Sequence, residues 1–198
     1  MADIRIERLS GADLIRLLPD LARLRITVFR DFPYLYEGSQ AYEEKYVRTY
    51  AENEGSVVVA AFDGDKVVGA STGVPLIREP DSVQAPFVER GMDPASVFYF
   101  GESVLLKSHR GHGIGVRFFE EREAHARALG GFERTCFCGV VRPADHPRRP
   151  PDYVPLNDFW RKRGYRPMEG FIGHITWKDL DEAEASPKPM QFWTKEIA

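Results

Sequence analysis

The spacing of apolar residues along the chain switches between the two-residue period of strands and the three-to-four-residue period of helices. The pattern begins with a strand and two helices, continues with a tight hairpin, and ends with alternating strands and helices. The predicted elements are a strand over 3–9, helices over 13–28 and 39–54, strands over 57–62, 66–74 and 96–107, a helix over 113–129, a strand over 132–141, a short helix ending at Gly164, and a strand over 171–177.

Three segments depart from a regular pattern. Pro19 interrupts the first predicted helix, which indicates either one kinked helix or two short ones. Residues 76–95 are rich in proline and glycine and are predicted to be an irregular excursion. Residues 181–198 contain a polar link and then Met190–Lys195, which is predicted to be either a last strand or an extended terminal arm.

The strand predicted over 96–107 is central to the fold. Alternation along it places five side chains on one face: Phe98, Phe100, Glu102, Val104 and Leu106. The order of elements mixes hairpins with strand–helix–strand crossovers, which predicts an α/β chain of the α+β kind, with a mixed sheet and helices on both faces. A length of 198 residues suits one compact domain, so we expect a single domain over 1–198, with 181–198 as its terminal link and strand or arm.

Composition narrows the class of protein. The chain is 43% hydrophobic and 29% charged, as in ordinary soluble proteins. It contains no signal-peptide pattern and no apolar run long enough to span a bilayer, so we expect a cytoplasmic protein without a membrane partner. The net charge of −3 argues against a nucleic-acid partner. A local basic segment over 142–149 either is simply solvated or meets an anionic ligand.

The sequence indicates no metal site. Cys136 and Cys138 form a C-x-C pair without the second pair that a zinc site needs, and we interpret them as packing residues in a reducing compartment. His109, His112 and His125 lack the spacing of metal ligands and are expected at the surface.

A glycine-rich turn joins the strand over 96–107 to the next helix, with the sequence Arg110-Gly111-His112-Gly113-Ile114-Gly115. The start of a helix has unpaired N–H groups and a partial positive charge, and glycine lets the backbone approach phosphate oxygens closely. The turn lacks the Gly-Lys-Ser/Thr of a P-loop and the glycine spacing of a Rossmann turn. Arg110, Gly113 and Gly115 instead match the pattern R/Q-x-x-G-x-G/A.

This segment resembles the acyl-CoA signature of the GNAT superfamily of N-acyltransferases. A second motif over 157–165 resembles the family's later aromatic helix, which ends in Gly-Phe/Tyr, here Gly164-Tyr165. The resemblance covers nearly the whole chain and implies a mixed, mostly antiparallel sheet of about seven strands with about four helices. It also implies acetyl transfer from acetyl-CoA, by direct attack, to the primary amine of a small molecule, amino acid or peptide-like acceptor.

The resemblance assigns residues to acetyl-CoA. It implies backbone contacts of Val104 and Leu106 with the pantetheine arm. Arg110 either reaches a phosphate or fixes the loop, and Asn157 either touches the pantetheine or caps its helix. The implied pyrophosphate contacts are the backbone amides of Gly111, His112, Gly113, Ile114 and Gly115.

Glu102 is the first candidate for the general base, because similar enzymes place a carboxylate in this strand and burial would raise its pKa. The alternative is that Glu102 orders the strand or binds an ammonium group. Ser103 has no evident partner for nucleophilic work. An amide near Val104 or Leu105 would meet the oxyanion.

The general acid is harder to assign, because Trp160 occupies the position where the family commonly has a tyrosine. Tyr153 is the first substitute, and Cys138, His146 and Tyr165 are weaker ones. The alternative is that no dedicated acid is needed, because a CoA thiol is an acceptable leaving group.

The acceptor pocket is expected at the early helices and the loop over 143–155. There Tyr34, Tyr36 and Glu37, together with Phe32, make an aromatic and acidic cluster suited to a cationic amine, or else an aromatic plug over the core. Another class of function keeps CoA binding without turnover, as a sensor or pseudoenzyme. Further alternatives are a different acyl group or a hydroxyl acceptor, and the oligomeric state stays open, a homodimer included.

Overall fold

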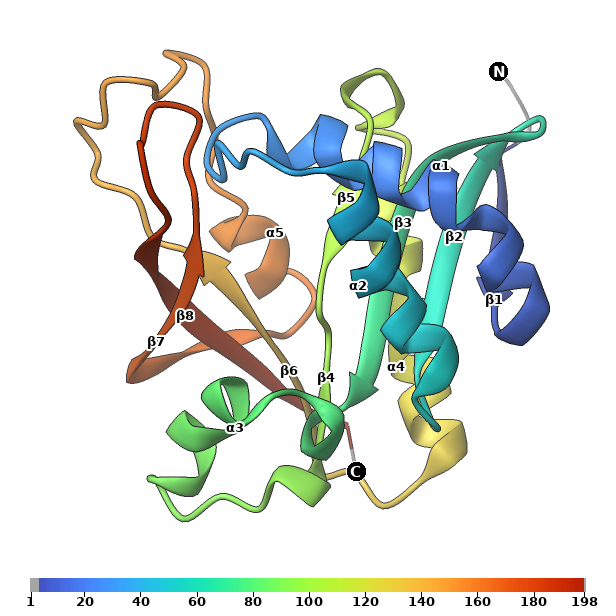
Figure 1. Ribbon diagram of the computed structural model, residues 1–198. Coiled ribbons are helices and arrows are strands. Elements are labelled where there is room, and N and C mark those ends of the chain that lie inside the picture. Colours follow the sequence, from blue (N-terminus) through green and yellow to red (C-terminus); the bar gives the residue numbers. More distant parts are fainter. Residues whose placement is uncertain (1–3, 198) are drawn as a thin grey trace.

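The computed structural model describes residues 4–197, and its elements follow the predicted order (Figure 1). The helices are α1 (Gly11–Phe29), α2 (Gln40–Glu52), α3 (Asp81–Val88), α4 (Ile114–Leu129) and α5 (Asn157–Arg161). The strands are β1 (Ile4–Leu9), β2 (Val57–Asp63), β3 (Lys66–Pro75), β4 (Val97–Tyr99), β5 (Ser103–Leu105), β6 (Arg134–Val140), β7 (Arg166–Trp177) and β8 (Ser186–Glu196). Short 3-10 turns lie at Leu76–Arg78, Pro94–Ser96 and Lys107–His109.

The strands form one 8-stranded sheet in the order β1-β2-β3-β4-β6-β8-β7, with β5 paired to β3. The β4–β6 pair is parallel, and the other pairs in the described sheet are antiparallel. The predicted mixed, mostly antiparallel sheet is therefore confirmed. The structure has one strand and one helix more than expected, because the central strand is divided in two and α3 forms within the excursion over 76–95.

Helices cover both faces of the sheet, as predicted. In Figure 1, α1 and α2 lie in front of the strands and α4 lies behind them. Alternate residues of β2 pack on opposite faces of the sheet. Val58, Ala60 and Phe62 pack in the cluster formed with α1 and α2. Val57, Val59 and Ala61 pack with the apolar face of α4. The continuous apolar run over 57–62 is explained by this burial on two sides.

The sheet is interrupted between β4 and β5. Along β3, Val74 pairs with Tyr99 whereas Ser71 pairs with Ser103, so the register shifts by one residue and one extra residue lies in the segment around Gly101. A bulge of this kind disrupts the ladder and re-aims the side chains that follow it. A side chain on Gly101 would clash with the hydroxyl oxygens of Tyr50 and Thr72, so glycine is required there by close approach.

This bulge overturns one prediction. Phe98 and Phe100 pack in the cluster that includes α4, whereas Val104 packs in the cluster that includes α1 and α2. The expectation that Phe98, Phe100, Glu102, Val104 and Leu106 share one face is therefore wrong, because the extra residue turns the chain over between Phe100 and Val104.

Two smaller expectations are resolved. Pro19 lies inside one continuous helix, α1, rather than between two helices. Met190–Lys195 belongs to a strand of the sheet, β8, which lies between β6 and β7. None of the helices within residues 4–197 is both long and apolar enough to cross a membrane.

Candidate functional site

The sheet opens into a V at its centre. β4 and β6 pair as far as Tyr99 and Cys136, and the Phe100 N–H donates to the Cys136 carbonyl at 2.7 Å. Beyond this point β5 pairs with β3 and β6 pairs with β8, so the two strands diverge, as Figure 1 shows. The divergence leaves two facing strand edges without each other as hydrogen-bond partners.

On the β5 side, the residues facing the opening follow from the hydrogen bonds to β3. The Thr72 N–H donates to the Glu102 carbonyl at 3.0 Å, and the Leu106 N–H donates to the Val68 carbonyl at 3.0 Å. Alternation in an antiparallel pair therefore directs the backbone groups of Glu102, Val104 and Leu106 to β3. The backbone groups of Val104 and Leu106, for which pantetheine contacts were expected, are therefore used within the sheet, and those of Ser103 and Leu105 face the opening instead.

The same reasoning applies to β6. The Val141 N–H donates to the Pro189 carbonyl of the neighbouring chain segment at 2.8 Å, whereas the Cys136 carbonyl faces β4. The backbone groups of Cys138 and Val140 thus face the opening. We call the gap between Ser103 and Leu105 on one edge and Cys138 and Val140 on the other the slot.

The glycine loop lies at the open end of the slot. Gly111 and Gly113 have φ angles of 83° and 80°, and Gly113 is the N-cap of α4. The first helical hydrogen bond of α4 is donated by the Val116 N–H to the Gly113 carbonyl at 3.0 Å. The N–H groups that precede Val116 in the turn therefore have no acceptor within the helix. The Arg110 Nε donates to the Leu105 carbonyl at 3.3 Å, which holds this side chain against the β5 edge.

The two sequence motifs meet beside this loop. A Cβ placed on Gly115 would lie 3.3 Å from Cζ of Phe159, and one on Gly139 would lie 2.8 Å from Cη2 of Trp160. Helix α5 therefore packs on both the start of α4 and strand β6, and closes one side of the slot. It begins at Asn157, with Leu156 at the N-cap position, so the side chain of Asn157 is exposed and does not cap the helix.

Trp160 is a packing residue. Its ring lies 5.1 Å from that of Phe137 and 5.0 Å from that of Trp193. Tyr165 is also buried, and its hydroxyl is hydrogen-bonded to Thr135 at 2.8 Å and donates to Glu123 at 3.1 Å. Neither side chain supplies a proton to the slot from this position.

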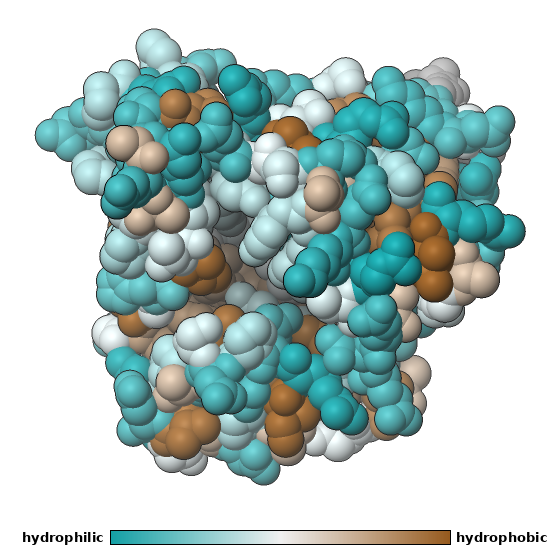
Figure 2. Space-filling model, viewed as in Figure 1, coloured by the Kyte–Doolittle hydropathy of each residue, from teal (hydrophilic) through white to brown (hydrophobic). Residues whose placement is uncertain are grey.

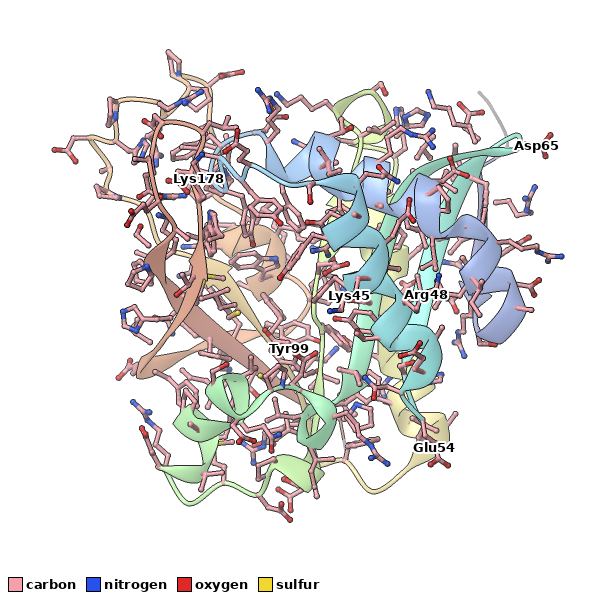
Figure 3. All side chains as sticks on the ribbon, viewed as in Figure 1. Lys45, Arg48, Glu54, Asp65, Tyr99 and Lys178 are labelled. Atoms are coloured by element: carbon pink, nitrogen blue, oxygen red, sulfur yellow. The ribbon has the colours of Figure 1, made fainter. Side chains whose placement is uncertain are left out.

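A cleft reaches the closed end of the slot from the face that carries α2. Figure 2 shows the molecule hollowed there, between α2 and the β6–β8 strands and above α3. Figure 3 places Tyr99 in this region, and its hydroxyl lies 3.1 Å from Sγ of Cys138. Burial raises the pKa of the Cys138 thiol to about 11, so this thiol is protonated at neutral pH.

Glu102 lies at the cleft in a buried ion pair with Arg25. Arg25 also pairs with the fully buried Glu43, and its guanidinium lies 4.2 Å above the ring of Tyr46. The bulge is what turns Glu102 toward α1 and brings it to this arginine. To accept a proton, Glu102 would have to give up its ion pair.

Glu79 is a second carboxylate at the cleft. Burial and the charge of Glu102 raise the pKa of Glu79 to about 7. Burial raises the pKa of Tyr50, Tyr99 and Cys138, and the charge of Glu79 adds to each of these shifts, so its carboxylate acts electrostatically on the same region. No cation lies within ion-pairing distance of Glu79 in residues 4–197, so its proton affinity is not offset by a partner.

The predicted acceptor residues separate in the structure. Burial and the charge of Cys138 raise the pKa of Tyr34, which lies beside the cleft with its ring 4.7 Å from that of Phe29. Tyr36 instead donates its hydroxyl to Glu43 at 2.7 Å. Glu37 pairs with Lys178 at 2.7 Å on the outer side of the loop, where Figure 3 marks Lys178.

Arg142 joins the loops that border the cleft on the side of Tyr34 and Tyr153, and we call this border the roof of the cleft. It donates to the carbonyls of Pro33 and Tyr34 at 2.7 and 2.8 Å and pairs with buried Asp179 at 2.7 Å. The basic segment over 142–149 therefore begins with a residue that joins two loops rather than with a free cation.

Tyr153 lies on the proline-rich loop at the same roof. Its ring makes an edge contact with Phe32 at 4.7 Å, and the Arg149 guanidinium lies 4.9 Å above it. Burial raises the pKa of Tyr153, so its hydroxyl holds its proton at neutral pH.

Three site residues are not evident from the sequence. Arg25, Glu79 and Arg122 lie in segments whose pattern indicates only a helix or an irregular excursion, and long-range packing brings them to the bulge. A charged residue at an apolar-face position of a helix, as Arg25 and Arg122 are, is the signal that could have drawn attention to two of them. Among the described residues, no group of three or more His, Cys, Asp or Glu side chains is arranged to hold a metal ion.

Comparison with known proteins identifies the family of the chain. The chain matches the model of the Acetyltransferase (GNAT) family over residues 21–150. No curated protein matches it by sequence. Solved structures share its fold at low identity. One is a putative GNAT acetyltransferase from Desulfovibrio desulfuricans, with TM-score 0.60, 12% identity, and 99% of this chain and 100% of that chain covered.

Two other structures indicate a donor or an acceptor for the proteins concerned. A putative acetyltransferase from Salmonella typhimurium, solved with acetyl-CoA, has TM-score 0.61 and 11% identity, with coverage of 98% of this chain and 94% of that one. The aminoglycoside 6'-N-acetyltransferase from Enterococcus faecium has TM-score 0.61 and 15% identity, with coverage of 98% and 97%. The family match over most of the chain, on a sheet opened beside a glycine loop, shows that the protein belongs to the GNAT family of acetyltransferases.

Proposed function

We propose that this acetyltransferase uses acetyl-CoA and transfers its acetyl group directly to the primary amine of a cationic small molecule or peptide-like acceptor. The observation that carries the proposal is the slot with its loop: two strand edges that face each other and end at exposed helix-start amides. Phosphate oxygens suit the amides of Gly111 to Gly115, and the amide groups of a pantetheine arm suit the strand edge at Ser103 and Leu105. The same fold in a neighbour solved with acetyl-CoA supports this choice of donor.

The remaining predicted contacts fit this placement. Arg110, already at the Leu105 carbonyl, lies where the slot meets the loop and is available to a phosphate. The side chains of His112, in the glycine loop, and Asn157, the first residue of α5, are both exposed. Ile114 is buried and anchors the start of α4, so its contribution is made through its backbone.

The thioester would then lie at the closed end of the slot, where the cleft meets it. The amine nitrogen attacks the thioester carbon, the carbonyl electrons move to oxygen, and their return breaks the carbon–sulfur bond. One proton leaves the amine, and one is taken up by the departing CoA thiolate. The chain must supply an acceptor for the first and can supply a donor for the second.

We assign the proton acceptor to Glu79 rather than to the first candidate, Glu102. A carboxylate held by Arg25 must break an ion pair to bind a proton, whereas Glu79 has a pKa of about 7 and no such partner among the described residues. Glu102 then acts by charge: it raises the proton affinity of Glu79 and attracts a cationic acceptor to the cleft. Tyr34 offers an aromatic surface to that acceptor.

Tyr153 is the proposed proton donor for the thiolate. Its position opposite Phe32, at the roof of the cleft, is the support for this role. Direct protonation from the amine by way of water is the alternative, because a thiolate is a good leaving group.

The test is release of CoA thiol from acetyl-CoA by the purified protein, measured against a panel of amines that includes an aminoglycoside, a polyamine, a free amino acid and a peptide N-terminus. We expect release that depends on one class of cationic amine, together with an acetylated product seen by mass spectrometry. Tight acetyl-CoA binding with no amine-dependent release would refute the transferase proposal and favour a CoA-binding sensor. Release with an alcohol would move the acceptor to oxygen.

A further inference from the structure

The buried side chain of Arg122 lies directly behind the bulge. It belongs to α4, is 1% exposed, and lies with its guanidinium 4.1 Å from the ring of Phe100 and 5.1 Å from that of Phe119. Each of its four hydrogen bonds goes to an uncharged oxygen. They join Nε to the Phe118 carbonyl at 3.0 Å, Nη1 to the carbonyls of Thr72 and Glu102 at 3.2 and 3.1 Å, and Nη2 to Oγ of Ser103 at 2.9 Å.

A cation in the interior without a direct carboxylate partner is costly, so its presence needs a reason. Burial lowers the pKa of Arg122 to about 10, which still leaves it charged at neutral pH. Three of its four contacts lie on the segment around the bulge or on the β3 residue opposite it. The guanidinium charge therefore acts mainly on the backbone that borders the closed end of the slot.

The contact with the Glu102 carbonyl has a consequence on the other side of the same peptide group. A trans peptide is planar, with its C=O and N–H pointing in opposite directions. Because the Glu102 carbonyl points toward β3 and Arg122, the N–H of Ser103 points into the slot. A cation bonded to the carbonyl also polarises the peptide and makes this N–H a stronger donor.

We propose that Arg122 is a positioning residue that fixes and polarises the Glu102–Ser103 peptide, so that the Ser103 N–H is the donor that stabilises the oxyanion of acetyl transfer. This inference rests on the proposed function. It replaces the expected donor near Val104 or Leu105 by the amide nearest the closed end of the slot. The Ser103 N–H stabilises the transition state through preorganisation, because Arg122 holds this donor in place before charge develops on the thioester oxygen.

The first experiment removes the donor itself. Ser103→Pro deletes the N–H on the slot edge and leaves the strand's bonds to β3, since those are made by Glu102, Val104 and Leu106. Ser103→Ala keeps the N–H and loses only the hydroxyl that binds Arg122. We expect kcat to fall about 10²–10³-fold in Ser103→Pro and about tenfold or less in Ser103→Ala, because the alanine variant weakens the contact with Arg122 but keeps the donor. Equal activity of the two variants would overturn the proposal.

The second experiment tests the arginine. Arg122→Lys keeps a charge but cannot reach all four oxygens, and Arg122→Met loses both charge and bonds. We expect kcat to fall by about tenfold and about a hundredfold respectively, with KM for acetyl-CoA changing less than about threefold. Arg127→Met is the matched control, because Arg127 lies on the same helix and its partner is Glu123. A loss that appears in KM alone would contradict the role.

A spectroscopic measurement separates this role from a structural one and does not need turnover. The carbonyl stretch of acetyl-CoA labelled with ¹³C at the thioester should shift to lower frequency on binding to the wild-type protein and shift less on binding to Arg122→Lys. An unshifted band in the wild type, with acetyl-CoA bound, would refute the Ser103 donor even if transfer occurs. A shifted band without amine-dependent release would support the donor while refuting the transferase.

Discussion

The assignment of the base to Glu79 can be tested by replacing each cleft carboxylate in turn. Glu79→Gln keeps the size of the side chain and removes its ability to accept a proton. If the carboxylate form of Glu79 takes the amine proton, a pKa of about 7 means that about one tenth of it is active at pH 6 and about nine tenths at pH 8. The Glu79 contribution to the rate should therefore rise about tenfold over this range.

The assay is kcat/KM for a single amine acceptor from pH 6 to pH 8, for the wild type, Glu79→Gln and Glu102→Gln. The acceptor's own amine titrates equally in all three experiments, so the ratio of wild-type to variant rates isolates the carboxylate. We expect this ratio to rise about tenfold for Glu79→Gln, reaching at least about 10² at pH 8. A flat ratio for Glu79→Gln, with the rise appearing for Glu102→Gln, would return the base role to Glu102.

The same group makes an independent prediction about stability. Its folded-state pKa is raised above the unfolded value, so its contribution is fully present below pH 4.5 and is lost as the pH rises through about 7. Glu79→Gln should therefore gain stability relative to the wild type as the pH increases, by about 1–3 kcal/mol at pH 8. Urea denaturation at pH 4.5 and pH 8 measures this difference, and an equal effect at both would show that Glu79 is not buried as described.

Three further predictions concern the loop and the roof of the cleft. Gly113→Val and its control Gly91→Val each place a β-branched residue at a positive φ angle, 80° and 71° respectively, so both variants should lose about 1–2 kcal/mol of stability. Calorimetry should find weaker CoA binding in Gly113→Val alone. Tyr153→Phe keeps the ring contact and removes the hydroxyl; single-turnover kinetics should show a fall of about tenfold or more if it is the acid, and none if water serves. Arg142→Met leaves buried Asp179 with only its longer contact to Lys188 at 3.7 Å and also removes the hydrogen bonds to the Pro33 and Tyr34 carbonyls. Denaturation should therefore show a loss of about 2–4 kcal/mol, and a loss below about 1 kcal/mol would contradict the ion pair's role.

Much of the fold could be predicted from periodicity, because its long elements are strongly patterned. The helix after the glycine loop begins and ends within a residue of its predicted bounds, since Gly113 and Gly130 adopt positive φ angles that mark both ends. The strands β2 and β3 follow from the apolar runs on either side of the turn at Gly64. These features depend on neighbours in sequence, which the pattern of residues displays directly.

The site was harder to predict because it depends on a break in the pattern. The segment over 97–106 alternates as one strand would, and the only local sign of the extra residue is the glycine at 101, which periodicity alone does not interpret. That residue is accommodated by Tyr50 and Thr72, which come from distant parts of the chain. Because the face of every later side chain depends on this bulge, the pattern indicated that Glu102 lies in the strand before the loop but did not reveal its ion pair with Arg25.

The resemblance to the GNAT family was informative for the same reason. It paired the glycine loop with a second motif over 157–165, and the structure brings the two together, with Phe159 against Gly115. It did not place the acceptor residues, because Tyr36 and Glu37 are engaged by Glu43 and Lys178 through contacts that no motif encodes.

The central claim is that acetyl-CoA lies in the slot, and a crystal structure of the complex tests it most directly. We expect the pyrophosphate on the amides of Gly111 to Gly115, the pantetheine hydrogen-bonded to the backbone of Ser103 and Leu105, and the thioester oxygen within hydrogen-bonding distance of the Ser103 N–H. Pantetheine bound outside the gap between β5 and β6, or a pyrophosphate away from the glycine loop, would contradict the account.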